Sequence, residues 1–214
     1  MNKIDLVSLP AYEFISSSEL ANDVLTEVES LNFIENVQNS ISTHPYKNEK
    51  LFAWFQECLD QVHELYYSDK IKLNIVTCWA NKTIRNEKHH AHAHPNSVVS
   101  GVYYLTDHEG CETSFYVDDP WMKLQNESIF TIGKNSTIHR SFVTNSISPV
   151  KGKLILFPSH ITHETKPNRK NQLRYSVAFN TFFSGTFFQH EKLPTSGVTT
   201  YLELDAKNIY GNVA

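Results

Sequence analysis

Two stretches in the first third of the chain have the apolar spacing of amphipathic helices. The first begins near Ser17 and Ser18, and its apolar residues then recur every three to four positions, which predicts a helix of about 13 residues. The second follows Pro45 and has a stronger pattern. We expect both helices to pack on one face of a sheet. The apolar stripe of the second helix consists of Leu51, Phe52, Phe55, Leu59, Val62 and Tyr66.

The period of the pattern changes near residue 70, where apolar and polar side chains begin to alternate as they do in strands. Many short strands separated by Asn, Gly, Pro and Asp indicate a sandwich, jelly roll or barrel rather than a parallel sheet with crossover helices. Helices followed by an antiparallel series form an α+β layout that is mainly β. The candidate strands are residues 70–80, 98–106, 112–117, 127–132, 137–143, 153–157, 160–166 and 173–183.

Composition narrows the class of protein. The chain has 214 residues, 40% of them hydrophobic, so it can bury a core without a disulfide or a structural metal. We expect one domain over residues 1–214, with 1–69 as a helical support and 70–183 as the core. A net charge of -4 without a Lys/Arg cluster argues against nucleic-acid partners. No apolar run approaches the roughly 20 residues of a membrane span, which argues against a membrane protein.

The cysteines and the first residues bear on the cellular compartment. Cys58, Cys78 and Cys111 are odd in number and far apart, which is typical of reduced thiols rather than of a disulfide framework. The first ten residues reach a proline before any apolar run, so they do not have the pattern of a signal peptide. We therefore expect a soluble, intracellular protein of the cytoplasm.

Histidine is the unusual residue type in this chain. There are eleven, and four of them lie within residues 89–94. If this segment is extended, His90, His92 and His94 project from one face, because side chains of a strand repeat every two residues. Two imidazoles at that spacing can bind one metal ion, although they could also be solvated polar residues. Imidazole binds iron, zinc, copper and nickel, so the cluster by itself does not identify the metal.

A second polar group follows the apolar strand that ends at Pro158 and Ser159. His163 lies just beyond this turn, Arg174 comes eleven residues later, and Ser176 is two residues further on. In a strand Arg174 and Ser176 face the same way, and a guanidinium beside a hydroxyl can bind a small carboxylate. A single arginine in a strand more often pairs with a surface carboxylate, but the histidine upstream favours a binding site.

Together these motifs resemble the 2-oxoglutarate and Fe(II)-dependent oxygenases that occur in bacteria and marine phages. More distantly, the chain is similar to the prolyl hydroxylases. The resemblance implies a double-stranded β-helix, or jelly roll, with iron and 2-oxoglutarate inside its open end. It covers about residues 75–183 and rests on His92-x-His94-Pro95-x-Ser97-x-x-Ser100-Gly101-Val102-Tyr103-Tyr104-Leu105, Asp119-Pro120, Leu156-Phe157-Pro158-Ser159 with His163, and Arg174-x-Ser176-x-x-Phe179-Asn180.

The resemblance also implies roles for single residues. His92 would be the first iron ligand and His163 the distal one. Arg174 would bind the carboxylate of 2-oxoglutarate that lies far from the iron, and Ser176 and Tyr104 would support that carboxylate.

The position of the third ligand departs from the commoner family pattern. That pattern has an aspartate or glutamate two residues after the first histidine, whereas this chain has His94. The triad implied here is therefore His92, His94 and His163. Two alternatives stay open: a register shifted to His90 and His92, or Asp119 as the third ligand.

We expect an Fe(II)/2-oxoglutarate dioxygenase that hydroxylates a small-molecule or peptidyl substrate, and a host cytoplasmic location if the gene belongs to a phage. Residues 1–69 and 184–214 could shape the pocket or a homodimer interface. A second hypothesis is a three-histidine cupin-type dioxygenase that uses no 2-oxoglutarate, which His94 favours and the pair Arg174 and Ser176 disfavours. A third is a non-catalytic jelly-roll binding module, because such folds host many functions.

Overall fold

The computed structural model describes residues 10–36, 41–118, 141–187 and 202–204 of the chain. The strand expected at 127–132 lies outside these residues, as does Asp119. The first residues of the strand expected at 137–143 also lie outside them.

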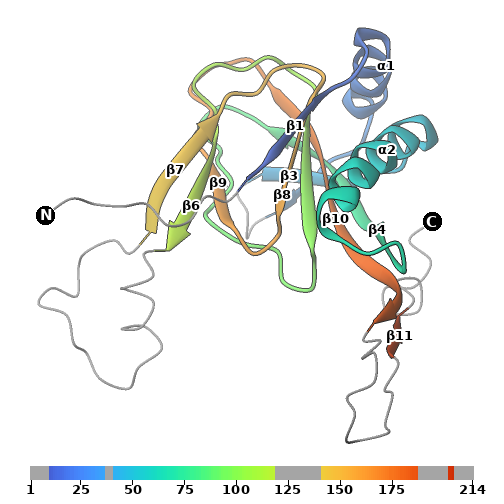
Figure 1. Ribbon diagram of the computed structural model, residues 1–214. Coiled ribbons are helices and arrows are strands. Elements are labelled where there is room, and N and C mark those ends of the chain that lie inside the picture. The colour runs from blue at the N-terminus through green and yellow to red at the C-terminus, as the bar shows by residue number, and fades with distance from the viewer. Residues whose placement is uncertain (1–9, 37–40, 119–140, 188–201, 205–214) are drawn as a thin grey trace, which may run out of the picture.

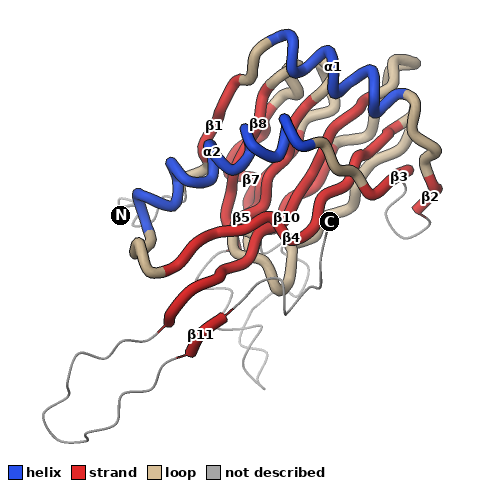
Figure 2. Tube along the Cα trace, turned by 90° about the vertical axis from the view of Figure 1, so that its right-hand side faces the viewer, coloured by secondary structure: helices blue, strands red, loops and turns tan. Residues whose placement is uncertain are grey.

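Both predicted helices are present. Helix α1 (Ser18–Glu29) begins after Ser17, whose hydroxyl accepts a hydrogen bond from the backbone N–H of Leu20 at 3.2 Å. Helix α2 (Glu49–Tyr66) is capped in the same way by Asn48, whose side chain accepts from the N–H of Leu51 at 2.9 Å. The two helices lie over one face of the large sheet, as Figures 1 and 2 show, which confirms the packing expected from their apolar stripes.

The strands form two antiparallel sheets that face one another, so the expectation of a mainly β jelly roll is confirmed. The small sheet has the order β7-β6-β9, with β7 (Ser141–Ile147), β6 (Thr113–Asp118) and β9 (Thr162–Thr165). The large sheet has the order β1-β8-β5-β10-β4-β3-β2, and β11 pairs with β10. Its strands are β1 (Tyr12–Ile15), β8 (Lys153–Pro158), β5 (Val99–Tyr104), β10 (Arg174–Phe187), β4 (Ile71–Thr83), β3 (Ile41–Pro45), β2 (Ile34–Asn36) and β11 (Leu202–Leu204).

The strands of the N-terminal part were not expected. β1 adds to one end of the large sheet through β8, while β3 and β2 add to the other end through β4. These strands have only three to five residues, and such short strands carry too few alternations to be recognised from their pattern. β7 and β10 each continue four residues beyond the expected end, to Ile147 and Phe187.

The two faces of the large sheet differ in chemistry. The face under α1 and α2 is apolar and forms the main core, and Gly101 belongs to it because an added Cβ would lie 2.3 Å from the ring of Phe179. The packing therefore explains the glycine of the Ser100-Gly101 motif. A smaller apolar cluster lies between the two sheets and consists of Tyr104, Phe115, Ile155, Phe157 and Ile161. This inner face also carries polar side chains, and it holds the site described next.

Candidate functional site

A cavity between the two sheets collects most of the polar residues singled out in the sequence, and we call it the polar cavity. Its walls come from β4, β5, β6, β8, β9 and β10 and from the histidine-rich segment before β5. Its polar and aromatic lining residues are Trp79, Asn81, His89, His92, His94, Ser100, Thr113, Phe157, His163, Thr165, Arg174 and Ser176.

Three histidines converge in this cavity. Each of His92, His94 and His163 offers one ring nitrogen, and these nitrogens lie within 4.8 Å of one another. The Nε2 atoms of His94 and His163 are 3.3 Å apart. Backbone hydrogen bonds bring the segments together: His92 and His163 exchange N–H···O=C bonds of 3.0 and 2.9 Å, and the N–H of His94 donates to the carbonyl of Ser159 at 2.9 Å.

Hydrogen bonds fix the tautomer of two of these rings. Nδ1 of His92 lies 2.8 Å from the carbonyl oxygen of His90, and Nδ1 of His163 lies 3.0 Å from that of Ile161. A carbonyl oxygen can only accept, so both Nδ1 atoms carry the hydrogen and both Nε2 atoms present a lone pair. Metal-ligating histidines are held in this way by a second partner on the other ring nitrogen.

Burial keeps these imidazoles neutral. Burial is the first cause that lowers the pKa of His163 to about 3 and that of His94 to about 4, and the neighbouring His92 lowers both further. The pKa of His92 is lowered by burial as well. At neutral pH the three rings are therefore neutral imidazoles, and neutral imidazole is the form that binds a metal.

The donor set fits a divalent transition metal. The Nε2 atom of His163 carries a lone pair and lies 3.3 Å from the Nε2 atom of His94, so these ring nitrogens are close enough together to bind one cation. Aromatic side chains enclose the rings: Phe157 lies 4.7 Å from His163 between ring centroids, and Trp79 stacks on His94 at 6.0 Å. That these residues hold iron stays a prediction.

Of the two alternatives for the third ligand, the structure describes only His90. His90 is exposed and outside the converging group, and its carbonyl holds the His92 ring instead. Asp119 lies outside the described residues.

Arg174 is a buried cation without a carboxylate partner among the described residues. Its side chain is 3% exposed, and its Nε atom has no hydrogen-bond partner. The guanidinium carbon lies 5.5 Å from the centre of the Tyr104 ring. An isolated buried charge is costly unless it is paired, so this position favours the binding of an anion from outside the chain.

Strand register places the other predicted residues beside Arg174. Ser176 lies directly opposite Tyr104 on β5 and opposite Asn81 on β4, so all three face the polar cavity. The Tyr104 hydroxyl donates to Thr113 at 2.8 Å, and its ring supports the guanidinium. Ser176 accepts a long 3.5 Å hydrogen bond from Asn81, whose Oδ1 is buried without a partner.

Several residues that line the site were not predicted from the sequence. Asn81 and Trp79 lie on β4; Trp79 belongs to the alternation expected over residues 70–80, whereas Asn81 follows the expected end of that strand, and nothing in the pattern distinguished this face as a site. Thr113 and His89 line the polar cavity from other segments. His89 is held to β9 by hydrogen bonds with Thr165 in both directions, of 2.8 and 3.1 Å.

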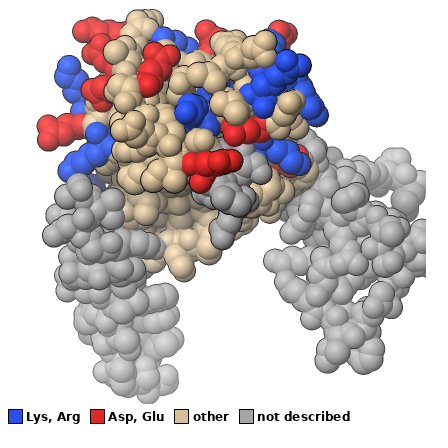
Figure 3. All heavy atoms as spheres, turned by 180° about the vertical axis from the view of Figure 1, so that it is seen from behind, with Lys and Arg blue, Asp and Glu red and all other residues tan. Residues whose placement is uncertain are grey.

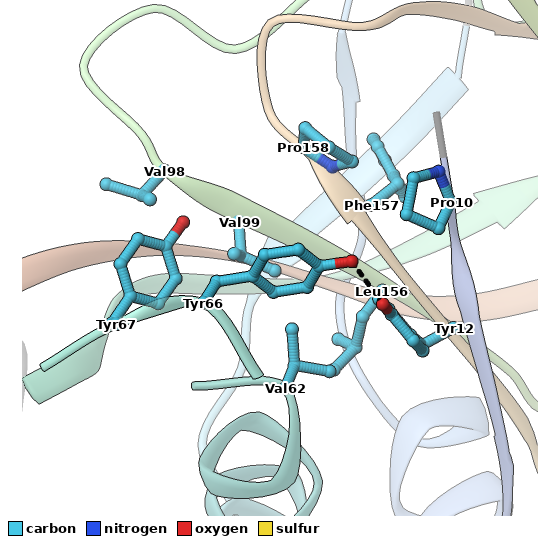
Figure 4. A pocket seen from close by; sticks show the side chains of 10 residues that line it. All are labelled: Pro10, Tyr12, Val62, Tyr66, Tyr67, Val98, Val99, Leu156, Phe157 and Pro158. Atoms are coloured by element: carbon cyan, nitrogen blue, oxygen red, sulfur yellow. Dashed lines mark hydrogen bonds between the residues drawn. The ribbon is translucent and has the colours of Figure 1, made fainter. Parts of the chain in front are cut away.

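A larger cavity lies elsewhere, on the helix-covered side of the sheet (Figure 4). It measures about 190 Å³ against about 40 Å³ for the polar cavity. Its walls are mostly aliphatic and aromatic, and its main polar feature is a contact between the hydroxyls of Tyr12 and Tyr66. The larger of these two cavities is therefore not the one whose side chains can bind a metal ion or an anion. We place the site in the polar cavity, because among the described residues it is there that converging imidazole nitrogens and a buried cation share a space.

The outer surface carries charges of both signs. On the face shown in Figure 3, Lys and Arg side chains lie among Asp and Glu side chains. Two exposed ion pairs, Lys166 with Glu112 at 3.2 Å and Lys170 with Glu109 at 3.6 Å, connect neighbouring loops. Pairs of this kind contribute little to stability.

The family of the chain follows from a match to a sequence model. Residues 77–180 match the family described as "Putative 2OG-Fe(II) oxygenase", and this range contains the three converging histidines, Arg174 and Ser176. Over these 104 of its 214 residues the chain matches the 2-oxoglutarate and Fe(II)-dependent oxygenases, and Fe(II) and 2-oxoglutarate are the cofactors of this family. The first of the three hypotheses is thereby confirmed at the level of the family. No curated protein matches the chain in sequence.

Solved structures share the fold. A prolyl-4-hydroxylase from Pseudomonas putida is 13% identical, with a TM-score of 0.58, and the match covers 82% of this chain and 94% of that one. HygX from Streptomyces hygroscopicus, with nickel, 2-oxoglutarate and hygromycin B bound, is 13% identical, with a TM-score of 0.57 and coverage of 94% and 95%. At these identities the likeness concerns the fold.

Among the described residues, neither helix has the length and the apolar character needed to cross a membrane.

Proposed function

We propose that this oxygenase binds Fe(II) through His92, His94 and His163 and hydroxylates a C–H bond of a small-molecule or peptidyl substrate. One observation carries the proposal: three neutral imidazoles converge in the same cavity that holds a buried arginine without a carboxylate partner among the described residues. A transition metal and a dianionic keto acid would complement these two features together.

Arg174 and Ser176 would hold 2-oxoglutarate. The guanidinium can bind the distal carboxylate with two hydrogen bonds, and its unpartnered Nε–H is one of the donors available for this. Ser176 and Asn81 lie one row further along the sheet, toward the histidines, and offer further polar contacts.

The chain's own residues orient the reactants and exclude water. When bound, the iron supplies the activation of oxygen that is coupled to the conversion of 2-oxoglutarate to succinate and carbon dioxide. Trp79 and Phe157 enclose the histidines, which limits the access of water to the reacting groups. Because all three histidines are neutral, the negative charge that balances a divalent metal comes from the keto acid.

Similar folds support the substrate class. HygX is described in complex with hygromycin B, and a prolyl hydroxylase from Trichoplax adhaerens, 15% identical with a TM-score of 0.53, is described in complex with a peptide fragment of hypoxia inducible factor. A small molecule and a peptide are therefore the two classes to test first.

Turnover of 2-oxoglutarate is the direct test of this function. With Fe(II) and ascorbate, the purified protein is expected to convert 2-oxoglutarate to succinate, measured by mass spectrometry, together with binding of the keto acid. A cupin-type dioxygenase without 2-oxoglutarate would bind the metal but neither bind nor consume the keto acid. Failure of both binding and turnover would contradict the proposal.

Substitution of His94 tests the third ligand. His94→Asp rebuilds two histidines and one carboxylate, so Fe(II) affinity should be retained or increased, because the added charge complements a hard divalent cation. His94→Ala removes a ligand and should lower Fe(II) affinity by more than about 10-fold. This is the smallest loss of metal affinity that is typical when a residue supporting a ligand is substituted. Anaerobic Fe(II) titration measures both. Equal affinity in the wild type and both variants would transfer the third position to His90 or Asp119.

A further inference from the structure

A fourth imidazole lies in the polar cavity outside the group of three converging histidines. His89 lines the cavity and is half-buried, and the centre of its ring lies 4.0 Å from that of the His92 ring, with a tilt of 38° between the two planes. It is not among the residues whose nitrogens converge on one point. Neither ring nitrogen of His89 has a hydrogen-bond partner among the described residues. His89 therefore brings to the cavity a hydrogen-bonding group that the metal site does not use.

A local irregularity in the backbone pairing turns His89 toward the cavity. His92 and His163 form an antiparallel bridge. Regular pairing would then place His90 opposite Thr165, two residues further along each segment. Instead, the N–H of Thr165 donates to the carbonyl of His89 at 3.1 Å, and the N–H of His89 donates to Thr165 Oγ1 at 2.8 Å. The extra residue re-aims the side chains, as bulges beside active sites do, so that His89 lines the cavity and His90 is exposed.

The pairing of β9 with β6 shows where along the cavity His89 lies. Thr165 follows the metal-site histidine of β9 by two residues, faces the same side, and pairs with Thr113 of β6. Thr113 accepts a 2.8 Å hydrogen bond from Tyr104, whose ring centre lies 5.5 Å from the guanidinium carbon of Arg174. Because His89 is bound to Thr165, its place on the cavity wall is between the converging histidines and Arg174.

We propose that His89 is a cosubstrate-binding residue, whose ring N–H donates a hydrogen bond to the end of 2-oxoglutarate that binds the metal. This inference rests on the proposed function, since it assumes that the keto acid spans the cavity from the metal to Arg174. An imidazole carries at least one N–H in either charge state, so a donor is present. The acceptor is the metal-side carboxylate, an anion that a nearby donor stabilises.

Packing alone does not account for an imidazole at this position. A phenylalanine would fill the same space beside His92, whereas a ring nitrogen in a partly enclosed cavity loses hydrogen bonds to water that a ligand has to replace. With His89, the cavity has donors for both ends of the keto acid, since Arg174 and Ser176 serve the distal carboxylate. Donors at two separate places fix the direction in which the molecule binds and the distance between its two carboxylates.

Anaerobic calorimetry of 2-oxoglutarate binding to the Fe(II)-loaded full chain tests this role. His89→Phe keeps an aromatic ring beside His92 but has no N–H. Its affinity for 2-oxoglutarate should fall by about 10–100-fold, the range expected for loss of a hydrogen bond to a charged group. Its Fe(II) affinity, titrated without the keto acid, should equal that of the wild type. His89→Gln restores an N–H donor and should bind 2-oxoglutarate more tightly than His89→Phe does.

Oxalate tests which end of the keto acid His89 contacts. This dianion can chelate a metal ion through two carboxylates and has no distal carboxylate for Arg174. His89→Phe should therefore weaken oxalate binding to the Fe(II)-loaded protein by a factor similar to that for 2-oxoglutarate. Wild-type affinity for oxalate in this variant would overturn the assignment of His89 to the metal-side end.

His90→Phe is the matched control, because it places the same substitution at the exposed histidine next in the chain. This variant should keep the wild-type affinity for Fe(II) and for 2-oxoglutarate. Wild-type 2-oxoglutarate affinity in His89→Phe would overturn the proposal, as would loss of Fe(II) from that variant, which would make His89 part of the metal site. If His89→Phe does not fold, the same measurements on His89→Leu decide. Failure of the wild type to bind 2-oxoglutarate would instead contradict the proposed function, so the two failures are distinguishable.

Discussion

Replacing His163 with alanine is expected to abolish metal binding while the protein stays folded. His163 is 5% exposed, and its ring contacts both other histidines as well as Phe157 and Phe115. The variant loses one of three ligands. Substitution of a residue that only supports a ligand lowers metal affinity by up to roughly 100-fold, so the loss of metal affinity in His163→Ala should be larger than that. Metal content by elemental analysis and thermal unfolding by circular dichroism measure the two effects.

His90→Ala is the control for this experiment. His90 is an exposed histidine of the same segment, and the carbonyl that holds His92 belongs to its backbone, which the substitution leaves in place. This variant should keep its metal. Unchanged metal content in His163→Ala would show that the triad is assigned incorrectly, and loss of metal in His90→Ala would favour the register shifted to His90 and His92.

Replacing Arg174 with alanine is expected to remove 2-oxoglutarate binding while the metal is retained. Without the guanidinium, the distal carboxylate would be buried among uncharged groups, which typically costs about 2–5 kcal/mol. This cost corresponds to a loss of affinity of about 30-fold to several thousandfold. Arg174→Lys keeps the charge but loses the two-pronged hydrogen bonding, so its affinity should lie between those of Arg174→Ala and the wild type.

Calorimetry of 2-oxoglutarate binding to the Fe(II)-loaded protein under anaerobic conditions measures this effect. Arg169→Ala is a matched control, because Arg169 is an exposed arginine that does not line the polar cavity and donates a 3.4 Å hydrogen bond to Asn86. Its variant should bind the keto acid as the wild type does. Wild-type affinity in Arg174→Ala would exclude the role of Arg174 in binding the cosubstrate, and loss of metal in that variant would show that Arg174 supports the histidines instead.

Features that depend on neighbours along the chain could be predicted from the sequence. The stripe from Leu51 to Tyr66 predicted α2, because the helical period is a property of consecutive residues. The alternation near residue 70 predicted β4 in the same way. The motif around His92 and His94, with His163, Arg174 and Ser176, located the candidate site through its resemblance to one family, and the model of that family matches residues 77–180.

Only the tertiary structure decided which of these side chains meet and what each one does. His92 and His163 lie beside one another because an isolated bridge pairs their backbones, and Ser176 faces Tyr104 and Asn81 because of the register of β10. A shift of one residue in that register would turn each side chain to the opposite face of the sheet, so spacing along the chain cannot specify such contacts.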